Sequence, residues 1–349
     1  MTPSPAKTLR RIRYRIGNVL WLLFAICMFA LSAVALALCF FRWQADQREI
    51  GIATQLAPSS GKFVHAADVN IFIQESGPTT GPAVLFVHGT GAWSETWREA
   101  MTVLAHAGFY AIAIDLPPFG YSRRPAQSNY NKQDQGKRII GVLNALKIDR
   151  AVLVGHSFGD GPTVEATFAA PERVRALVLV DAALSIHNDG ATAKEPSPLL
   201  NGFFATTALR DSVVATFLTS PLFTKQLLKS FIADPVHATD ARVRVYQQPL
   251  VVKGTTHAFG EWLPALLGSS PNAVSEDPTA YRGLTMPVYI IWGNLDTITP
   301  LVQGERLARL TPRSELTVLQ GVGHIPQIED PAHFNEALLR VLLKIKSEL

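Results

Sequence analysis

Short apolar runs separated by amphipathic stretches dominate the chain from residue 62 onward. Alternating apolar and polar residues over 62–66 and 69–75 predict two antiparallel strands at the edge of a sheet. Continuous apolar runs further along predict buried central strands, and the amphipathic stretches between them predict helices. In chain order these elements are strand 83–88, helix 95–107, strand 110–115, helix 132–146, strand 152–156, helix 158–170 and strand 176–180.

This alternation stops near Leu184 and resumes with strand 286–292, helix 301–310, strand 315–319 and helix 331–345. Alternating strands and helices predict an α/β fold with a doubly wound, mostly parallel sheet of eight strands. The core then comprises residues 62–184 and 284–349. Residues 185–283 are mixed and largely helical, and they are far longer than an ordinary connection. They predict a helical cap over the strand ends, where ligands bind in such sheets.

The run Val19–Phe41 has no charged residue and exceeds the roughly 20 residues that a membrane-spanning helix needs. We expect an uncleaved transmembrane helix here, followed by a linker over 42–61. A cleaved signal peptide is the alternative, but its apolar core usually has only about 7 to 15 residues. A lipoprotein signal would place a smaller residue than Leu38 before Cys39.

A basic arm, residues 1–18, precedes this span with five basic residues and no acidic one. The excess of positive charge predicts a cytoplasmic N-terminus, with the body on the periplasmic or extracytoplasmic side. The five positive charges of this arm exceed the formal net charge of +4 of the whole chain, so the rest of the chain is not basic. Nucleic-acid binding by the body is therefore not expected.

The composition also restricts the chemistry of the body. Both cysteines, Cys27 and Cys39, lie in the apolar run, so the body has neither a disulfide nor a reactive thiol. The body contains no dinucleotide or P-loop fingerprint and no histidine cluster with metal-ligand spacing. We therefore expect no cofactor and no metal.

The pentapeptide 155–159, Gly-His-Ser-Phe-Gly, lies between a predicted strand and a predicted helix. This Gly-x-Ser-x-Gly pattern is typical of a nucleophile elbow, a strained turn that presents one serine hydroxyl above the end of a sheet. Amides at the start of the following helix would favour negative charge that develops near Ser157. An ordinary surface turn is the alternative for the same five residues.

A serine hydroxyl needs a base to take its proton, and the base needs an acid to orient it. Asp296 and His324 each follow a predicted strand, and they occur in the order serine, acid, histidine. We expect Ser157, Asp296 and His324 to form a catalytic triad. The alternatives are a helix N-cap for Asp296 and an ordinary loop position for His324. Asp181, at the end of strand 176–180, is the competing acid.

Two backbone amides are candidates for an oxyanion hole. One belongs to Phe158, directly after the serine. The other belongs to Thr90, in the His-Gly-Thr-Gly turn of residues 88–91. The glycines on both sides of Thr90 would allow a substrate to approach closely. A simple connecting turn is the alternative for this segment.

Over residues 60–347 the chain resembles the α/β-hydrolase family with a lid after the sixth strand. The resemblance is carried by the segments 88–91, 115–122, 155–159, 292–296 and 323–324. It implies a hydrolase, and serine at position 157 argues against the dehalogenase and epoxide-hydrolase branches. Two positions depart from the usual pattern, because Pro118 and Asp160 stand where glycine is common. Asp160 is expected to cap the helix that follows Ser157, or else to disfavour anionic substrates.

We therefore expect a membrane-anchored serine hydrolase that cleaves a small apolar or ester-containing substrate through an acyl-enzyme on Ser157. The alternatives on the same fold are carbon–carbon or amide bond hydrolysis and cofactor-free perhydrolysis. A non-catalytic ligand-binding protein tethered to a membrane is the third possibility.

Overall fold

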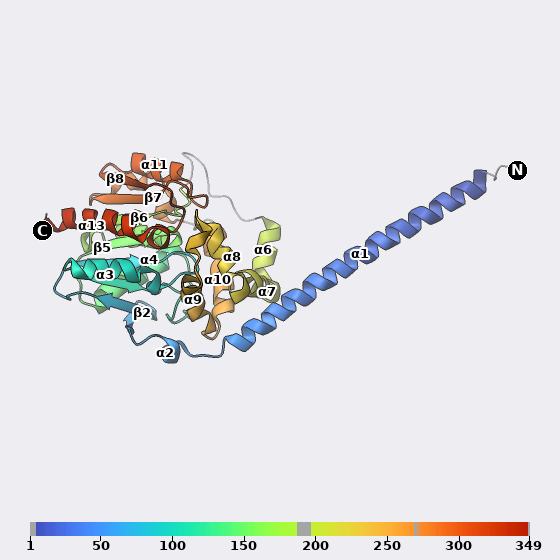
Figure 1. Ribbon diagram of the computed structural model, residues 1–349, viewed down its shortest axis with the longest axis horizontal. Helices are drawn as coiled ribbons and strands as arrows, with labels where there is room; N and C mark the ends of the chain where they lie inside the picture. Colours follow the sequence, from blue (N-terminus) through green and yellow to red (C-terminus); the bar gives the residue numbers. More distant parts are fainter. Residues whose placement is uncertain (1–4, 187–196, 269, 271, 348–349) are drawn as a thin grey trace.

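The computed structural model describes residues 5–186, 197–268, 270 and 272–347. Within these ranges the body consists of one sheet covered by helices on both faces, with a helical cap on one side (Figure 1). The predicted cap, 185–283, therefore falls partly outside the described residues, as do the first four residues of the basic arm.

The sheet has eight strands in the order β1-β2-β4-β3-β5-β6-β7-β8. The β1–β2 and β2–β4 pairs are antiparallel and all other pairs are parallel, which confirms the predicted fold class. The strands are β1 (Gly61–Ala66), β2 (Val69–Ser76), β3 (Ala83–Val87), β4 (Tyr110–Ile114), β5 (Ala151–His156), β6 (Val174–Val180), β7 (Val288–Gly293) and β8 (Ser314–Leu319).

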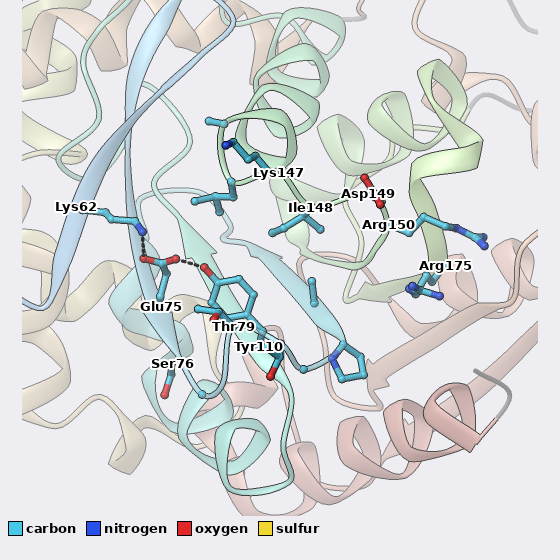
Figure 2. Close-up of a pocket in the computed structure, with 17 residues that line it drawn as sticks. Lys62, Glu75, Ser76, Thr79, Tyr110, Lys147, Ile148, Asp149, Arg150 and Arg175 are labelled. Atoms are coloured by element: carbon cyan, nitrogen blue, oxygen red, sulfur yellow. Dashed lines mark hydrogen bonds and ion pairs between the residues drawn. The ribbon is translucent and has the colours of Figure 1, made fainter.

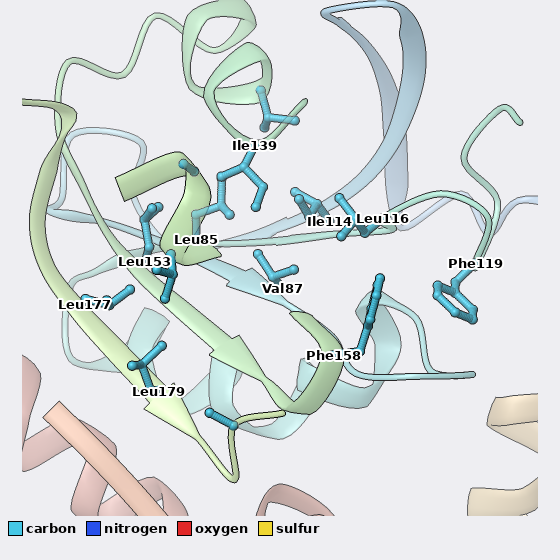
Figure 3. Packing of buried hydrophobic residues seen from close by; sticks show 14 of the residues in the cluster. Leu85, Val87, Ile114, Leu116, Phe119, Ile139, Leu153, Phe158, Leu177 and Leu179 are labelled. Atoms are coloured by element: carbon cyan, nitrogen blue, oxygen red, sulfur yellow. The ribbon is translucent and has the colours of Figure 1, made fainter. Parts of the chain in front are cut away.

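Both faces of the central strands are apolar because helices cover both of them. Leu85 and Leu153 face one cluster of buried side chains, shown in Figure 3, whereas Val84 and Val152 face a second cluster across the sheet. The first cluster includes side chains from α4 (Lys132–Ala145), α5 (Asp160–Ala169) and α11 (Leu301–Leu310); the second includes side chains from α3 (Arg98–His106) and α13 (Pro331–Ser347).

The cap helices follow β6 in the chain and lie on one side of the body (Figure 1). Phe259 and Trp262 from the cap join the same buried cluster as Leu85, so the cap packs on the core. The cap helices are α6 (Pro198–Ala205), α7 (Thr207–Phe217), α8 (Pro221–Phe231), α9 (Asp240–Gln247) and α10 (Thr255–Leu267). Two short helices lie elsewhere, α2 (Ala53–Leu56) and α12 (Pro326–Glu329).

The first helix, α1, runs from Pro5 to Arg48 and projects away from the body (Figure 1). Among the described residues it is the one helix long and apolar enough to cross a membrane. It extends beyond the expected span, 19–41, at both ends. Residues 42–48, predicted as linker, are helical because they contain no glycine or proline to end the helix.

The last turns of α1 pack against the cap, mainly against α7. Leu38, Phe41, Arg42 and Ala45 are partly or fully buried and follow the spacing of one helix face. Just beyond the helix, both carboxylate oxygens of Glu49 accept hydrogen bonds of 3.1 Å from the amide of Thr256 in α10. The end of α1 is thus part of the folded body.

Candidate active site

The chain makes a sharp turn at Ser157, between the end of β5 and the start of α5. Ser157 has a φ of +53°, a left-handed conformation that is uncommon for a residue with a side chain. A short 3₁₀ turn, Ser157–Gly159, leads into α5. A Cβ atom on Gly159 would lie 2.5 Å from the carbonyl oxygen of His88 and 2.9 Å from that of Val87. Glycine at position 159 therefore lets the elbow approach β3, as the Gly-x-Ser-x-Gly pattern predicts.

We expect Gly159→Ala to lower the free energy of unfolding by about 1–3 kcal/mol, because the added methyl group meets backbone that cannot move aside cheaply. Gly202→Ala on α6 is the matched control, since a Cβ there would have no atom within 4 Å. The control should be neutral or slightly stabilising, as alanine favours a helix. Thermal unfolding of both variants checks this, and equal midpoints would contradict it.

Ser157, His324 and Asp296 form one continuous hydrogen-bonded chain of buried side chains. The His324 Nε2 lies 2.8 Å from the Ser157 Oγ, and the His324 Nδ1 lies 2.7 Å from the Asp296 Oδ2. Thr299 donates its hydroxyl to the same Asp296 oxygen at 2.6 Å, and the Ile298 amide donates to the other at 2.7 Å. The structure thus brings together the three residues singled out from the sequence.

A second acidic residue, Glu329, fixes the loop that carries His324. Its carboxylate accepts hydrogen bonds from the amides of Gly323 at 2.9 Å and of Ala233, in the cap, at 2.7 Å. The amide of His324 in turn donates to the Phe231 carbonyl at 3.0 Å. The histidine loop and the cap are therefore tied together. No pattern in the sequence marks Glu329 for this role, because its partners are backbone amides from two distant segments.

Asp181, the competing acid, lies beside Asp296 but makes a different contact. Its Oδ1 accepts a hydrogen bond of 2.9 Å from the amide of Gly293. Burial and the adjacent charge of Asp296 raise the pKa of Asp181 well above its usual value. Burial acts to raise the pKa of Asp296 too, but the bonds from His324 and Thr299 outweigh it and lower that pKa. The geometry and charge therefore favour Asp296 as the partner of His324.

Among the described residues, the same two acids and His324 are the one group of three or more His, Cys, Asp or Glu residues whose potential metal-ligand atoms all lie within 4.8 Å of one another. His324 Nδ1 and Asp296 Oδ2 already bond to each other. A metal ion would have to break this contact, so we describe the cluster as part of the hydrogen-bonded chain.

Asp160 does not cap α5, contrary to one of the two roles expected for it. Its side chain is fully buried, and neither carboxylate oxygen has a hydrogen-bond partner. Burial raises the pKa of this carboxyl well above its usual value. Burial therefore favours the neutral form of Asp160 behind the elbow.

Asp160→Asn should gain stability relative to the wild type as the pH rises from 4 to 7. Between the pKa of Asp160 in the unfolded chain and its raised pKa in the folded protein, only the folded protein keeps the proton, so wild-type stability falls by up to about 1.4 kcal/mol per pH unit. Asparagine is neutral at every pH and removes this loss. Thermal midpoints at pH 4, 5.5 and 7 measure the effect.

Asp240→Asn is the control of opposite sign. A hydrogen bond from Lys225 lowers the pKa of Asp240 below its usual 3.8, so its replacement should lose stability relative to the wild type as the pH rises through the range below about 4, which a further thermal midpoint at pH 3 measures, and should change little between pH 5.5 and 7. A pH-independent difference between Asp160→Asn and the wild type would contradict the neutral state of Asp160.

The turn that follows β3 is held by its own histidine. The His88 Nε2 accepts a hydrogen bond of 2.9 Å from the Leu116 amide, so the proton lies on Nδ1, which donates to the Gly89 carbonyl at 2.8 Å. Burial lowers the pKa of His88 to about 4, which keeps this ring neutral. Thr90, next in the chain, lines the same cavity as Ser157. The turn is therefore rigid beside the serine.

The cavity above Ser157 is small and apolar, with a volume of about 160 Å³. Its polar side chains include His156, whose Nε2 donates to the His324 carbonyl at 2.8 Å and whose pKa burial lowers to about 3. No lysine, arginine, aspartate or glutamate lines it in the described part of the chain. The cap supplies most of its wall, through Leu218, Thr224, Leu227, Leu228, Phe231, Tyr246, Leu250, Phe259, Trp262 and Leu266.

A larger, open hollow of about 820 Å³ lies at the opposite end of the strands (Figure 2). There Lys62 forms an ion pair of 2.5 Å with Glu75, which also accepts a hydrogen bond from the hydroxyl of Tyr110. Its wall includes Ala83, at the amino end of β3, whereas Ser157 follows the carboxyl end of β5. This hollow is therefore separate from the serine site.

Comparisons with known proteins agree with this architecture. The family described as alpha/beta hydrolase fold matches residues 82–331. The 2-hydroxymuconate semialdehyde hydrolase of Pseudomonas sp. strain CF600 is 32% identical over 286 residues, which cover 81% of this chain and 93% of that protein.

Two crystal structures extend the comparison. The meta-cleavage product hydrolase from Pseudomonas fluorescens IP01 has a TM-score of 0.64 at 27% identity and covers 82% of this chain and 98% of its own. A bacterial membrane phospholipase A has a TM-score of 0.61 at 21% identity and covers 96% of this chain and 99% of its own. The strand order, the serine elbow and the matched family agree, and the chain belongs to the α/β hydrolase family.

Proposed function

We propose that this protein is a serine hydrolase that uses Ser157 as nucleophile, His324 as general base and then acid, and Asp296 as the orienting acid. The observation that carries the proposal is the hydrogen-bonded chain from the Ser157 Oγ through His324 to Asp296, which opens into an apolar cavity. A base within 3 Å of the hydroxyl and an acid on its other nitrogen meet the geometric needs of nucleophilic catalysis.

In the first half of the reaction, the Ser157 Oγ bonds to a carbonyl carbon of the substrate while its proton passes to the His324 Nε2. The amides of Thr90 and Phe158 are proposed to stabilise the resulting oxyanion. The bond to the leaving group then breaks, and the leaving group takes the proton from His324. Water hydrolyses the acyl-enzyme by the same steps, releasing an acid and free Ser157.

The first candidate for the broken bond is a carbon–carbon bond next to a ketone. Two relatives support it, because they cleave bonds of this kind. They are named 2-hydroxymuconate semialdehyde hydrolase and meta-cleavage product hydrolase, and they are 32% and 27% identical to this chain. A carbon leaving group must carry a second carbonyl that delocalises the electron pair until His324 returns the proton. These relatives favour this bond over the carboxylic ester expected from the sequence.

A carboxylic ester is the second candidate, and the cavity favours it. A carboxylate in the substrate would find no cationic side chain among the described residues that line the cavity. Burying an unpaired carboxylate costs several kcal/mol. Whichever bond is cleaved, we therefore propose that the part of the substrate inside the cavity is apolar and uncharged.

Membrane anchoring by α1 is part of the same proposal. The helix is long and apolar enough to span a bilayer. The match to the membrane phospholipase A covers 96% of this chain, so it must include most of α1. The basic residues before the apolar run favour a cytoplasmic N-terminus and a catalytic body on the periplasmic or extracytoplasmic side.

Two measurements on the purified full chain test the catalytic proposal. A fluorophosphonate probe should label wild-type protein at Ser157, and absence of labelling in folded protein would contradict the nucleophile. The bond is then identified by comparing kcat/KM for 2-hydroxymuconate semialdehyde, an uncharged diketone and uncharged nitrophenyl esters of graded length. A preference for the charged semialdehyde would contradict the proposal that the part of the substrate inside the cavity is uncharged.

A further inference from the structure

Helix α6 is strongly apolar for a helix at the surface of the body. Half of its eight residues are large apolar side chains, none is charged, and none of the eight is buried. Leu199 alone is 86% exposed. The other three, Leu200, Phe203 and Phe204, are half-buried, and the two phenylalanines also pack against the core. Apolar groups that are exposed together at a surface usually contact a partner.

Exposed apolar side chains continue from α6 onto its neighbours. Phe217, at the end of α7, is 55% exposed, and Leu222, at the start of α8, is 71% exposed. We call these two residues, together with the four on α6, the cap apolar surface. Helices α6 and α7 pack against each other and lie on the side of the body from which α1 leaves (Figure 1).

A chain of aromatic contacts joins this surface to the end of the membrane span. The ring of Phe217 lies 6.0 Å from that of Phe223, which lies 5.8 Å from the ring of Phe41. Phe41 is the last residue of the apolar run. The headgroup region of a bilayer is roughly 5–8 Å deep on each side. If Phe41 lies at the edge of the hydrocarbon, Phe223 therefore falls within the headgroup region.

We propose that the cap apolar surface rests in the interface of the same bilayer that α1 spans. This inference deepens the proposed function and rests on the proposed membrane span. Trp43, exposed on α1 with its ring 6.1 Å from that of Phe40, is of the residue type enriched at membrane interfaces. Residues 197–209 contain no charged side chain, so docking this segment would remove no charge from water.

The cap lies between the lipid surface and the serine. Leu218, at the end of α7, and Leu227 and Leu228, on α8, line the cavity above Ser157. The helices that carry Phe217 and Leu222 therefore also form the roof of the cavity. An apolar substrate dissolved in the bilayer would reach Ser157 by crossing a single layer of helices, without passing through water.

Lipid quenching of a single fluorescent label tests the docking directly. Both cysteines lie in the span, so a full chain with Cys27→Ser and Cys39→Ser accepts one new cysteine at Leu199→Cys or Leu222→Cys. Each variant is labelled with an environment-sensitive dye and reconstituted in phosphatidylcholine vesicles whose lipids carry a nitroxide near the headgroup. Leu343→Cys, on α13 at the far side of the body from α1, is the surface control (Figure 1). A chain that retains Cys39 alone reports on the span.

We expect strong quenching and blue-shifted emission at positions 199 and 222, quenching at Cys39, and neither effect at position 343. Quenching at Cys39 with none at 199 and 222 would overturn the docking and leave the anchor intact. No quenching at Cys39 would overturn the span and the docking together. Self-quenching between labels at 199 without lipid quenching would show that a second copy covers the surface, which also overturns the docking.

A single charge added to the cap apolar surface tests whether docking at the membrane matters for activity. Leu199→Asp should lower the turnover of an apolar ester presented in vesicles by about tenfold, since an interfacial side chain changes from apolar to charged. Turnover of a short water-soluble ester should stay unchanged, because Leu199 does not line the cavity. Leu343→Asp is the control. Equal loss on both substrates would indicate damage to the fold and overturn the inference.

Discussion

Replacing Ser157 with alanine is expected to lower kcat/KM by about 10⁴- to 10⁶-fold, because the hydroxyl that forms the acyl-enzyme is lost. Ser220→Ala is the matched control. Ser220 is also buried, and its hydroxyl has no hydrogen-bond partner, but it does not line the cavity. Steady-state kinetics on the best substrate found for the wild type measures both variants.

The Ser157→Ala result also separates an enzyme from a ligand-binding protein. The variant should still bind substrate, since the cavity wall is unchanged, and calorimetry with the same substrate measures this. Full activity in Ser157→Ala, with the control also active, would exclude Ser157 as the nucleophile. Full cellular function of a Ser157→Ala variant that has lost its catalytic activity would instead favour the non-catalytic alternative.

Replacing the acid of the triad is expected to give the second-largest effect on kcat, and it distinguishes the two candidate acids. Asp296→Asn should lower kcat by as much as about 10⁴-fold, because an amide cannot stabilise the positive charge that His324 acquires. Asp181→Asn should change kcat by less than about tenfold, because the Asp181 carboxyl accepts its hydrogen bond from the Gly293 amide whereas His324 bonds to Asp296, and burial raises the pKa of Asp181.

The pair of variants is informative because both acids are buried and lie beside each other. Rates from pH 5 to 9, together with unfolding curves, distinguish loss of chemistry from loss of fold. If Asp181→Asn proved the more damaging variant in a folded protein, Asp181 and not Asp296 would be the acid of the triad.

The sequence predicts the order and type of the core elements because local patterns determine them. The continuous apolar runs at 83–88 and 110–115 become β3 and β4, buried on both faces. Glycines on each side of Ser157 indicate an elbow, and they are needed because a Cβ atom would lie 2.4 Å from Asp160 Oδ1 at position 155 and 2.5 Å from the His88 carbonyl oxygen at position 159. The prediction starts the following helix at residue 158, whereas α5 begins at Asp160 because the strained turn comes first.

Features that depend on contacts between distant segments cannot be predicted from a local sequence pattern. The raised pKa of Asp160 follows from the complete burial of its side chain, which no neighbouring residue in the sequence indicates. The extension of α1 beyond Phe41 is stabilised by contacts with the cap, which lies more than a hundred residues away in the chain. Glu329 gains its role only when the cap and the histidine loop meet.

The contact between the end of α1 and the cap decides how the enzyme searches for substrate. Glu49 bonds to Thr256, and the Arg48 side chain donates to the Leu250 carbonyl, so no free tether separates the helix from the body. If α1 spans the bilayer as proposed, a body fixed in this way explores a plane by lateral diffusion instead of sweeping a volume. Its encounter rate would then follow the number of substrate molecules per unit of surface area, and diluting the vesicles at constant composition would leave that rate unaltered.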